Sequence, residues 1–265
     1  MKRQEILREI IKEDKMLVAK LLDKIEFLER KSSVQVTDFL NLYEKELIKK
    51  TLNKIKFNNF LFYGGYQDAE REILVLYSER FGEEYLKKEK ENSLKVIRIT
   101  LPKYIEKYTH KEYLGGIMKL GMKREKIGDI LVTDRGADII TISQIAEILQ
   151  TSLKELKRFS KSEIEILEIE EITKVEPEFE KQNIIVPSMR LDCFVSELVK
   201  TSRTKALEII KQERVFINFE VVTNNSKQVK TDDIITIRGK GRFYIKEAIG
   251  NTKKDRIVIE VLKNK

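Results

Sequence analysis

The sequence predicts an α+β protein in three successive parts, and three observations support this. Apolar residues recur at helical spacing through residues 1–56. Short strands and helices alternate through residues 57–172, and residues 188–265 begin with a pair of short helices that short strands follow. The acidic stretch 173–187, which contains two of the chain's three prolines, predicts a linker. We therefore expect an N-terminal helical region, a central α+β domain, a linker and a C-terminal module.

The first part is expected to be helical. Isoleucine and leucine residues recur at helical spacing from Ile6 to Leu28, and the run Lys31-Ser32-Ser33 interrupts them. Thr37-Asp38 then provides the start signal for a further helix. Charged residues are interspersed along both segments, so we expect the outer faces of these helices to be solvated.

A change of period near Phe57 predicts two strands joined by a glycine turn. Apolar residues at 57–63 and 73–77 flank the pair Gly64-Gly65. A glycine pair can cradle a phosphate, but a phosphate-binding loop also needs spaced glycines followed by Lys and Ser or Thr, and these are missing here. We therefore interpret Gly64-Gly65 as a tight connection that uses positive φ.

The central part follows one recognisable order of strands and helices. Thr109 is a good helix N-cap, and Asp134-Arg135-Gly136 predicts a hairpin. The resulting β-α-β-β-α-β order is that of ferredoxin-like folds, which include the common RNA-recognition module (RRM). The expected strands are 94–99, 130–133, 137–141 and 164–169, and the expected helices are 109–120 and 142–149.

The two central strands of this RRM-like domain lack the residues with which that module usually holds RNA. The module stacks bases on aromatic side chains of its central strands, and neither 94–99 nor 137–141 contains one. We therefore expect this sheet to be a scaffold or a protein-facing surface, or to contact RNA through its loops. Lys123, Arg124 and Lys126 in one basic loop are candidates for secondary RNA contacts, although a solvated helix end explains the same pattern.

The net charge of the chain is concentrated near the C-terminus. Residues 181–265 contain 18 Lys and Arg against 10 Asp and Glu, a net charge of +8, whereas residues 1–180 contain 34 of each. A localised basic excess is typical of proteins that bind polyanions. A membrane surface is the competing partner, but it would require a basic amphipathic helix with an exposed apolar face. The basic residues here belong to a compact pattern of helices and strands, so nucleic acid is favoured and no membrane partner is expected.

The composition argues against several other classes of protein. The chain is 41% hydrophobic and 36% charged with both signs mixed, which is typical of a folded protein. It has no apolar run of the roughly 20 residues that span a membrane and no apolar signal core near its start, so we expect a cytoplasmic location. The single cysteine, Cys193, is expected to be a small buried side chain and leaves no multi-cysteine metal site. The single histidine, His110, has no catalytic partner in the sequence, and we expect neither a metal nor another cofactor.

The C-terminal module combines an apolar helical face with a basic helix start. Four apolar residues between Leu191 and Leu198 form one face of a first helix. Ser202 predicts the cap of a second helix, whose first turn contains Arg203 and Lys205. Cations are mildly unfavourable at a helix N-terminus, whereas phosphate is attracted there. This conflict within the helix indicates a phosphate-binding site.

A longer series of residues in this module follows a known pattern. The series consists of Arg190-Leu191-Asp192, Ser202-Arg203, Ala206, Ile210, Val215, Ile217-Asn218, Val229, Asp233, Ile235 and Arg238. It resembles the S4 RNA-binding domain, in which a helix pair faces structured RNA. The residues that the resemblance places on this RNA face are Arg190, Ser202, Arg203, Lys205, Lys211, Arg214 and Asn218, and the basic turn adds Arg238, Lys240 and Arg242. Two glycines that are usual in the family are replaced here by Glu213-Arg214 and by Phe219.

Further motifs precede the S4 pattern. They are Tyr63-Gly64-Gly65-Tyr66, Ala69-Glu70-Arg71, Leu114-Gly115-Gly116-Ile117-Met118 and the run of residues 120–130, LGMKREKIGDI. Together with the S4 pattern they resemble the YlmH family of bacterial RNA-binding proteins, over about residues 57–245. The resemblance implies association with ribosomal RNA of the large subunit and with tRNA. It also implies a role in rescuing stalled complexes that carry peptidyl-tRNA, in ribosome-associated quality control. We expect the protein to act as a monomer.

Two other functions compete with RNA binding alone. S4 domains also occur in pseudouridine synthases, whose catalytic aspartate lies in an Arg-Leu-Asp motif, so Arg190-Leu191-Asp192 could belong to an RNA-modifying enzyme. Here, however, Asp192 lies inside an expected helix, is followed by Cys-Phe-Val instead of the Thr and Gly of the synthase motif, and has no large second domain to house that chemistry. A non-enzymatic protein is therefore favoured. A DNA- or protein-binding regulator is the third hypothesis, and nothing in the sequence requires it.

Overall fold

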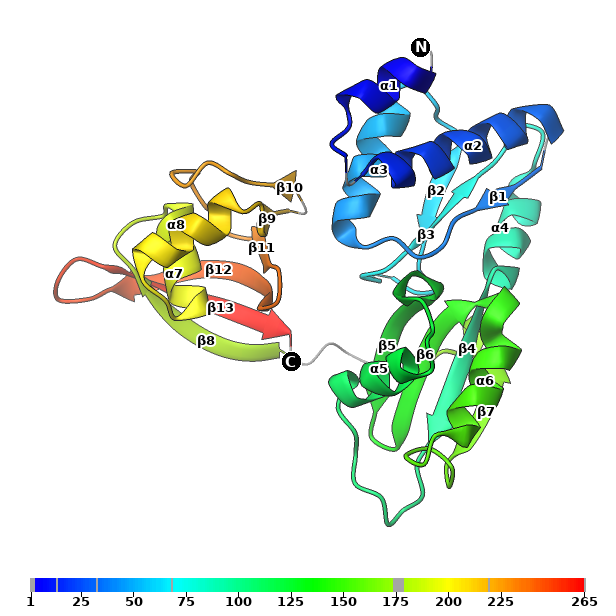
Figure 1. Ribbon diagram of the computed structural model, residues 1–265. Coiled ribbons are helices and arrows are strands. Elements are labelled where there is room, and N and C mark those ends of the chain that lie inside the picture. Colours follow the sequence, from blue (N-terminus) through cyan, green and yellow to red (C-terminus); the bar gives the residue numbers. More distant parts are fainter. Residues whose placement is uncertain are drawn as a thin grey trace. The chain divides into compact units, whose positions relative to one another are not determined.

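The computed structural model describes residues 3–12, 14–31, 33–67, 69–173, 179–218 and 220–264. It forms two compact units, Met1–Val175 and Glu176–Lys265. Each unit packs helices on antiparallel sheets (Figure 1), which confirms the α+β class. Within the described residues, no helix is long and apolar enough to cross a membrane. The same residues contain no group of three His, Cys, Asp or Glu side chains that could hold a metal ion.

The first unit begins with helices packed on a small sheet. Its elements are α1 (Arg3–Glu9), α2 (Lys15–Lys31), β1 (Gln35–Val36), α3 (Leu42–Lys54), β2 (Phe60–Tyr63) and β3 (Ile73–Leu76), with the strands in the order β1-β3-β2. Apolar residues of α2 and α3 share one buried cluster with Leu74 and Leu76 of β3. The boundary that the sequence suggests between residues 56 and 57 therefore falls inside this packed layer. We name α1 to α3 with β1 to β3 the N-terminal layer.

Helix α3 begins later than Thr37-Asp38 predicts. Its N-cap is Asn41, whose side chain accepts the Glu44 backbone N–H at 3.0 Å, while the Glu44 carboxylate accepts the Asn41 N–H at 2.8 Å. Thr37 is occupied by cross-strand pairing, since its hydroxyl accepts the backbone N–H of Leu74 at 2.9 Å. The pairing with β3 holds residue 37 in an extended conformation, so the helix cannot start there.

The turn between β2 and β3 uses its two glycines in different ways. Gly65 has a φ of +95°, as the tight-connection interpretation predicts. Gly64 is needed for space, because a Cβ there would lie 2.3 Å from the Cβ of Ala69. The motif around Gly64-Gly65 thus brings the chain back sharply toward β3.

A four-stranded antiparallel sheet forms the centre of the first unit. Its strands are β4 (Leu94–Thr100), β5 (Ile127–Thr133), β6 (Gly136–Ile142) and β7 (Glu163–Leu167), in the order β5-β6-β4-β7. Helices α5 (His110–Lys119) and α6 (Ala146–Glu155) pack on one face over a shared apolar cluster. Short 3-10 turns lie at η1 (Arg124–Lys126), η2 (Ser143–Ile145) and η3 (Ile169–Glu171). The chain therefore passes through this sheet in the expected β-α-β-β-α-β order.

The structure contains one helix in this unit that the sequence pattern did not predict. Helix α4 (Glu83–Asn92) directly precedes β4, and Leu86 is the one buried residue among its described positions. Its sequence is mostly charged, so it lacks the apolar periodicity by which helices are recognised.

The second face of the central sheet is covered by the N-terminal layer. On β4 and β6 this face is formed by the cross-strand pairs Leu94–Ile142 and Val96–Ile140. All four side chains are buried in one cluster, whose other members are Phe39, Ile73, Val75 and Ile169. An RNA-recognition module stacks bases on its two central strands, but here that surface is filled by apolar side chains of the same chain. RNA can therefore reach this domain at its loops and edges, but not on these pairs.

The second unit is a six-stranded antiparallel sheet with two helices on one face (Figure 1). Helices α7 (Leu191–Val199) and α8 (Arg203–Lys211) are joined to the sheet by one apolar core. Cys193 is buried in that core, as expected. The strands are β8 (Phe179–Val186), β9 (Val215–Ile217), β10 (Glu220–Val221), β11 (Ile234–Ile237), β12 (Gly241–Asn251) and β13 (Ile257–Asn264), in the order β10-β9-β11-β12-β13-β8.

Strand β8 occupies most of the expected linker 173–187. It pairs with β13 in a continuous register from Val186–Ile257 to Phe179–Asn264. Ile184 and Val186 are buried in the core of the second unit, so this stretch folds as an edge strand despite its acidic and polar composition. Residues 174–178 lie outside the described residues.

Candidate nucleic-acid interface

The starts of α7 and α8 meet at one buried carboxylate, that of Asp192, whose side chain is 1% exposed. Arg190, the N-cap of α7, donates from Nε to Oδ1 at 3.1 Å and from Nη2 to Oδ2 at 3.0 Å. Arg203, the first residue of α8, donates from Nε and Nη2 to Oδ2 at 3.0 and 2.8 Å. The side chains of Arg190 and Arg203 remain 34% and 58% exposed. One carboxylate thus fixes two guanidinium groups from different helices at the protein surface.

The charges in this cluster stabilise one another. Burial raises the pKa of Asp192, but the hydrogen bonds from Arg190 and Arg203 outweigh burial and lower this pKa to about 2. The hydrogen bond to Asp192 also raises the pKa of Arg190. Two cations share one anion, so the cluster keeps a positive charge. Each guanidinium uses its Nε–H and one Nη2–H for Asp192, which leaves both N–H groups of Nη1 and the second of Nη2 to donate to a phosphate.

The start of α8 adds a further cation to this surface. Lys205 is exposed in the first turn of the helix, two positions after Arg203. Ser202, also expected on the RNA face, caps the helix, because its hydroxyl accepts the Lys205 backbone N–H at 3.3 Å. Lys211 is exposed at the opposite end of α8, where it complements the helix dipole. The structure therefore separates Lys211 from the cluster of Arg190, Asp192 and Arg203.

Three more of the residues that were expected to bind RNA lie at or beside the turn between β11 and β12. Arg214 donates from Nη2 to the carbonyl oxygen of Arg238 at 3.1 Å. The Arg238 guanidinium lies 5.6 Å from the centroid of the Phe216 ring, and Lys240 is exposed in the turn. These three cations remain candidates for contacts with a polyanion.

Two expected residues are used inside the fold. Asn218 has a φ of 49°, donates to Asp233 Oδ1 at 2.8 Å and accepts the Ile234 backbone N–H at 2.9 Å, so its side chain closes a turn. Arg242 is 9% exposed. It lies in β12, where it pairs with Thr236 of β11 and its Nη1 lies 3.5 Å from the Tyr244 hydroxyl, whereas the sequence suggested a solvent-facing basic turn. The Asn218 side chain therefore does not present its polar atoms as the S4 resemblance implied, and Arg242 is not the exposed residue that the basic turn suggested.

In the first unit the expected basic loop is tied into the fold. Lys126 forms a 2.6 Å ion pair with Asp38 of the N-terminal layer. Arg124 donates from Nη1 to the carbonyl oxygens of Ile127 and Gly128 at 2.5 and 3.1 Å. Lys123 is exposed at the start of this loop and is the most accessible of the three candidates.

Sequence reasoning does not single out two residues that hold this loop in place. Asp129 accepts hydrogen bonds from the Tyr66 hydroxyl at 2.8 Å and from the backbone N–H groups of Glu70 and Arg71 at 2.7 and 3.2 Å. Arg71 in turn donates to two backbone carbonyls of neighbouring segments. Burial lowers the pKa of Arg124 to about 10, and the nearby charge of Arg71 adds to this effect. Both partners of this network belong to sequence motifs, at residues 63–71 and 128–130. Their hydrogen bonds to one another become visible only in the folded chain.

Comparisons with known proteins match both halves of this arrangement. A family model described as a putative RNA-binding domain in YlmH matches residues 87–172, and the S4 domain model matches residues 189–235. A protein of Bacillus subtilis (strain 168), named "Ribosome-associated protein quality control protein P2", is 26% identical over 255 residues, which cover 95% of this chain and 96% of that protein. These matches support a relationship to the YlmH family. A solved structure titled "Cell division protein ylmH from Streptococcus pneumoniae" is 25% identical, covers 62% of this chain and 97% of its own, and has a TM-score of 0.48.

The candidate residues are divided between the two matched domains. Lys123, Arg124 and Lys126 lie in the YlmH-type domain, and the cluster around Asp192 lies in the S4 domain. The S4 match ends within β11, so the remaining strands β12 and β13 lie outside it. The first matched domain is described as a putative RNA-binding domain and the second as an S4 domain, and neither description names a catalytic activity.

The geometry of Asp192 does not suit a catalytic residue. A catalytic aspartate must reach its substrate, but this side chain is 1% exposed and accepts four hydrogen bonds from two arginines. The resemblance to the Arg-Leu-Asp motif of pseudouridine synthases therefore has a structural explanation within the S4 helix pair.

Proposed function

We propose that this protein binds folded RNA of the large ribosomal subunit, together with tRNA, in ribosome-associated quality control. The complexes that it binds would be stalled ones that still hold peptidyl-tRNA. Two findings support the proposal: the matches to two RNA-binding domains, and the name of the Bacillus subtilis relative. That relative aligns with 95% of this chain, so the shared features extend through both units.

One observation carries the proposal: Asp192 prearranges Arg190 and Arg203 on the surface of an S4 helix pair. Folded RNA presents phosphates at fixed positions, and guanidinium groups match phosphate geometry with paired hydrogen bonds. Because the arginines are already held, they lose little conformational freedom when RNA binds. The helix pair is therefore expected to recognise the shape and backbone of structured RNA.

The proposed role is binding by a single chain, without catalysis. The buried and fully engaged Asp192 is the reason to prefer this role over RNA modification. Incubation with unmodified ribosomal RNA, followed by mass mapping of its nucleotides, tests this part of the proposal. A nucleotide whose mass changes only when the protein is present would contradict it.

A pair of matched variants tests the binding face. Arg203→Gln with Lys205→Gln removes two charges from the start of α8, whereas Lys15→Gln with Lys20→Gln removes two exposed charges from α2, outside both matched domains. Sedimentation with purified large subunits should weaken at least about tenfold for the α8 variant, since lost arginine and phosphate contacts cost on the order of 1–3 kcal/mol. The α2 control should sediment like the wild type. Equal sedimentation of both variants and the wild type would exclude the helix pair as the contact face.

A further inference from the structure

Most of the net charge of the second unit lies outside the matched S4 domain. Residues 189–235 contain eight Lys and Arg against seven Asp and Glu, a net charge of +1. Residues 236–265 contain nine Lys and Arg against three Asp and Glu, a net charge of +6. The polyanion signal that the composition indicates therefore comes mainly from the strands after the S4 domain.

These charges gather at the two ends of one long strand. Strand β12 has eleven residues, so its ends lie roughly 33 Å apart at about 3.3 Å per residue. Arg238 and Lys240 flank its first end, whereas Lys253, Lys254 and Arg256 lie in the turn that joins its second end to β13. All five are exposed. We name residues 252–256 the hairpin tip; Figure 1 shows this turn projecting at the edge of the second unit.

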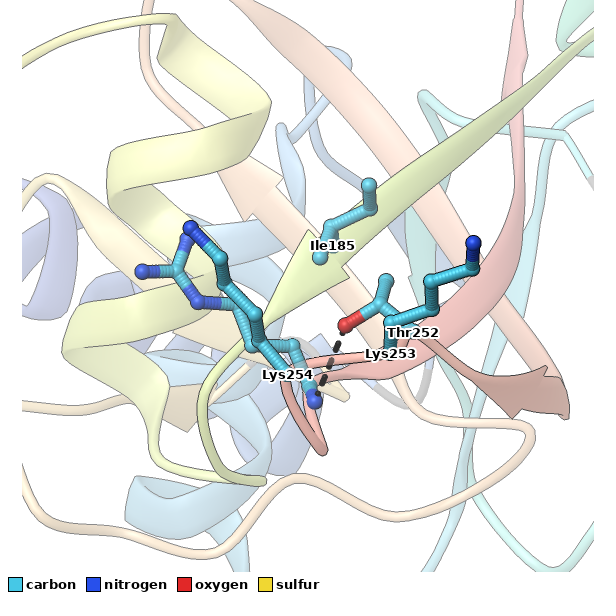
Figure 2. Close-up of a pocket in the computed structure, with 5 residues that line it drawn as sticks. Ile185, Thr252, Lys253 and Lys254 are labelled. Atoms are coloured by element: carbon cyan, nitrogen blue, oxygen red, sulfur yellow. Dashed lines mark hydrogen bonds between the residues drawn. The ribbon is translucent and has the colours of Figure 1, made fainter.

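The hairpin tip is an ordered turn. Thr252 and Arg256 form two hydrogen bonds. The Thr252 N–H donates to the Arg256 carbonyl at 2.8 Å. The Arg256 N–H donates to Thr252 Oγ1 at 3.2 Å, the bond drawn as a dashed line in Figure 2. Asp255, the one acidic residue of the tip, accepts a hydrogen bond from Asn251 Nδ2 at 3.1 Å. The turn therefore holds three cations at fixed backbone positions and keeps its carboxylate engaged with the strand end.

A shallow hollow lies beside these cations. Ile185 of β8 lines it together with Thr252, Lys253, Lys254 and Arg256, and its volume is about 270 Å³ (Figure 2). Ile185 is 42% exposed, so an apolar surface adjoins the basic turn. A phosphate with its attached ribose combines the same two properties, because the anionic group meets the cations and the sugar can pack against an aliphatic side chain.

We propose that the hairpin tip is a second RNA-backbone contact of the S4 unit, distinct from the cluster around Asp192. The inference rests on the proposed function, since it assigns a further contact to the same RNA. Lys253, Lys254 and Arg256 bind phosphate groups, and Ile185 supports the adjoining sugar. The exposed cations at both ends of β12 extend the binding surface beyond the helix pair that defines S4 domains.

The test compares Lys253→Gln with Lys254→Gln against the α2 control Lys15→Gln with Lys20→Gln. Dissociation constants for purified large subunits are measured between about 50 and 200 mM salt, where each phosphate contact contributes about 0.7 to 0.9 to the slope of log affinity against log salt. Loss of two contacts should make the slope less steep by about 1.4 to 1.8 for the hairpin variant. The slope of the control variant should equal that of the wild type. These lysines take no part in the hydrogen bonds of the turn that involve side chains, so the fold is expected to persist, and circular dichroism checks it.

Three outcomes separate this inference from the proposed function. A wild-type slope for the hairpin variant, with weakened binding for Arg203→Gln/Lys205→Gln, would overturn the hairpin contact and leave the helix-pair contact standing. Wild-type binding by both variants would overturn both proposals. Vesicles of phosphatidylcholine and phosphatidylserine supply the third comparison: if the hairpin variant loses vesicle binding while its slope with ribosomal subunits is unchanged, the tip recognises lipid headgroups and the RNA contact is wrong.

Discussion

The Asp192 carboxylate accepts two hydrogen bonds from the guanidinium group of Arg203, at 3.0 and 2.8 Å. The two residues lie in the first turns of consecutive helices, so this contact fixes the start of α8 against the start of α7. It also places an acidic group directly behind the surface that we propose for RNA. An acidic residue would weaken a basic interface by charge alone. Asp192 instead holds Arg190 and Arg203 in position through hydrogen bonds.

The exchange Asp192→Asn separates positioning from simple attraction. It raises the net charge of the protein by one unit, so long-range attraction alone would strengthen RNA binding. If Asp192 positions the arginines, binding instead weakens about tenfold, because ordering a long side chain costs about 0.5–1.5 kcal/mol and two arginines lose their support. Filter binding to large-subunit RNA measures the effect, at a temperature where melting curves show both proteins folded. Tighter binding by the variant would rule out the positioning role.

Acid should remove the stabilising effect of this cluster. Aspartate has an unfolded pKa of about 3.9, and the folded pKa of Asp192 is about 2. A lowered folded pKa stabilises the fold above the unfolded pKa, and this contribution is lost as the pH falls from about 4 through about 2. The free energy of unfolding of the wild type should exceed that of Asp192→Asn by about 2–3 kcal/mol at neutral pH. Urea titrations should show this gap narrowing below about pH 4, whereas a constant gap down to pH 2 would contradict the assignment.

Two turns without their usual glycines predict opposite responses to glycine. Glu213 has a φ of 56° and Asn218 a φ of 49°, both in the left-handed region. Glu213→Gly relieves backbone strain and should stabilise the second unit by roughly 0.5 kcal/mol, since the strain of about 1–2 kcal/mol exceeds the entropic cost of glycine. Asn218→Gly also removes the hydrogen bonds to Asp233 and Ile234, so it should destabilise by about 1 kcal/mol. Thermal unfolding of both variants measures this contrast. Equal changes in melting temperature would show that the backbone φ alone determines the effect of glycine on stability.

The packing of the N-terminal layer on the central sheet is tested at two glycines. A Cβ on Gly128 would lie 2.7 Å from the Phe39 ring, whereas a Cβ on Gly115 has no neighbour within 4 Å. Gly128→Ala should therefore destabilise the first unit by about 1–3 kcal/mol through overpacking. Gly115→Ala, in the interior of α5, should stabilise it by about 0.5–1 kcal/mol. Denaturant unfolding measures both, and a neutral Gly128→Ala would mean that this contact is loose.

Local signals predicted much of the fold. The Thr109 cap, the hairpin at residues 134–136 and the Ser202 cap depend on neighbouring residues in the sequence, and each lies where it was expected. Features that depend on distant partners were missed. Thr37 leaves the helix because it pairs with β3, and residues 179–186 form a strand because β13 offers them an edge.

The candidate interface shows the same division between local and distant information. The sequence placed cations at the starts of α7 and α8, where helix capping and the S4 pattern are local. It could not show that Arg242 is buried, or that the Asn218 side chain forms hydrogen bonds with Asp233 and Ile234. It also could not show that Asp192 joins Arg190 and Arg203, because that contact depends on how the two helices pack.

The most direct measurement of the central claim is the affinity of the intact protein for purified large ribosomal subunits as a function of salt. If about six phosphates are contacted, the affinity should fall about a thousandfold between roughly 50 and 200 mM salt. An affinity that does not change over this range, or no binding at low salt, would contradict the account that the basic surface of the second unit binds the ribosomal RNA backbone.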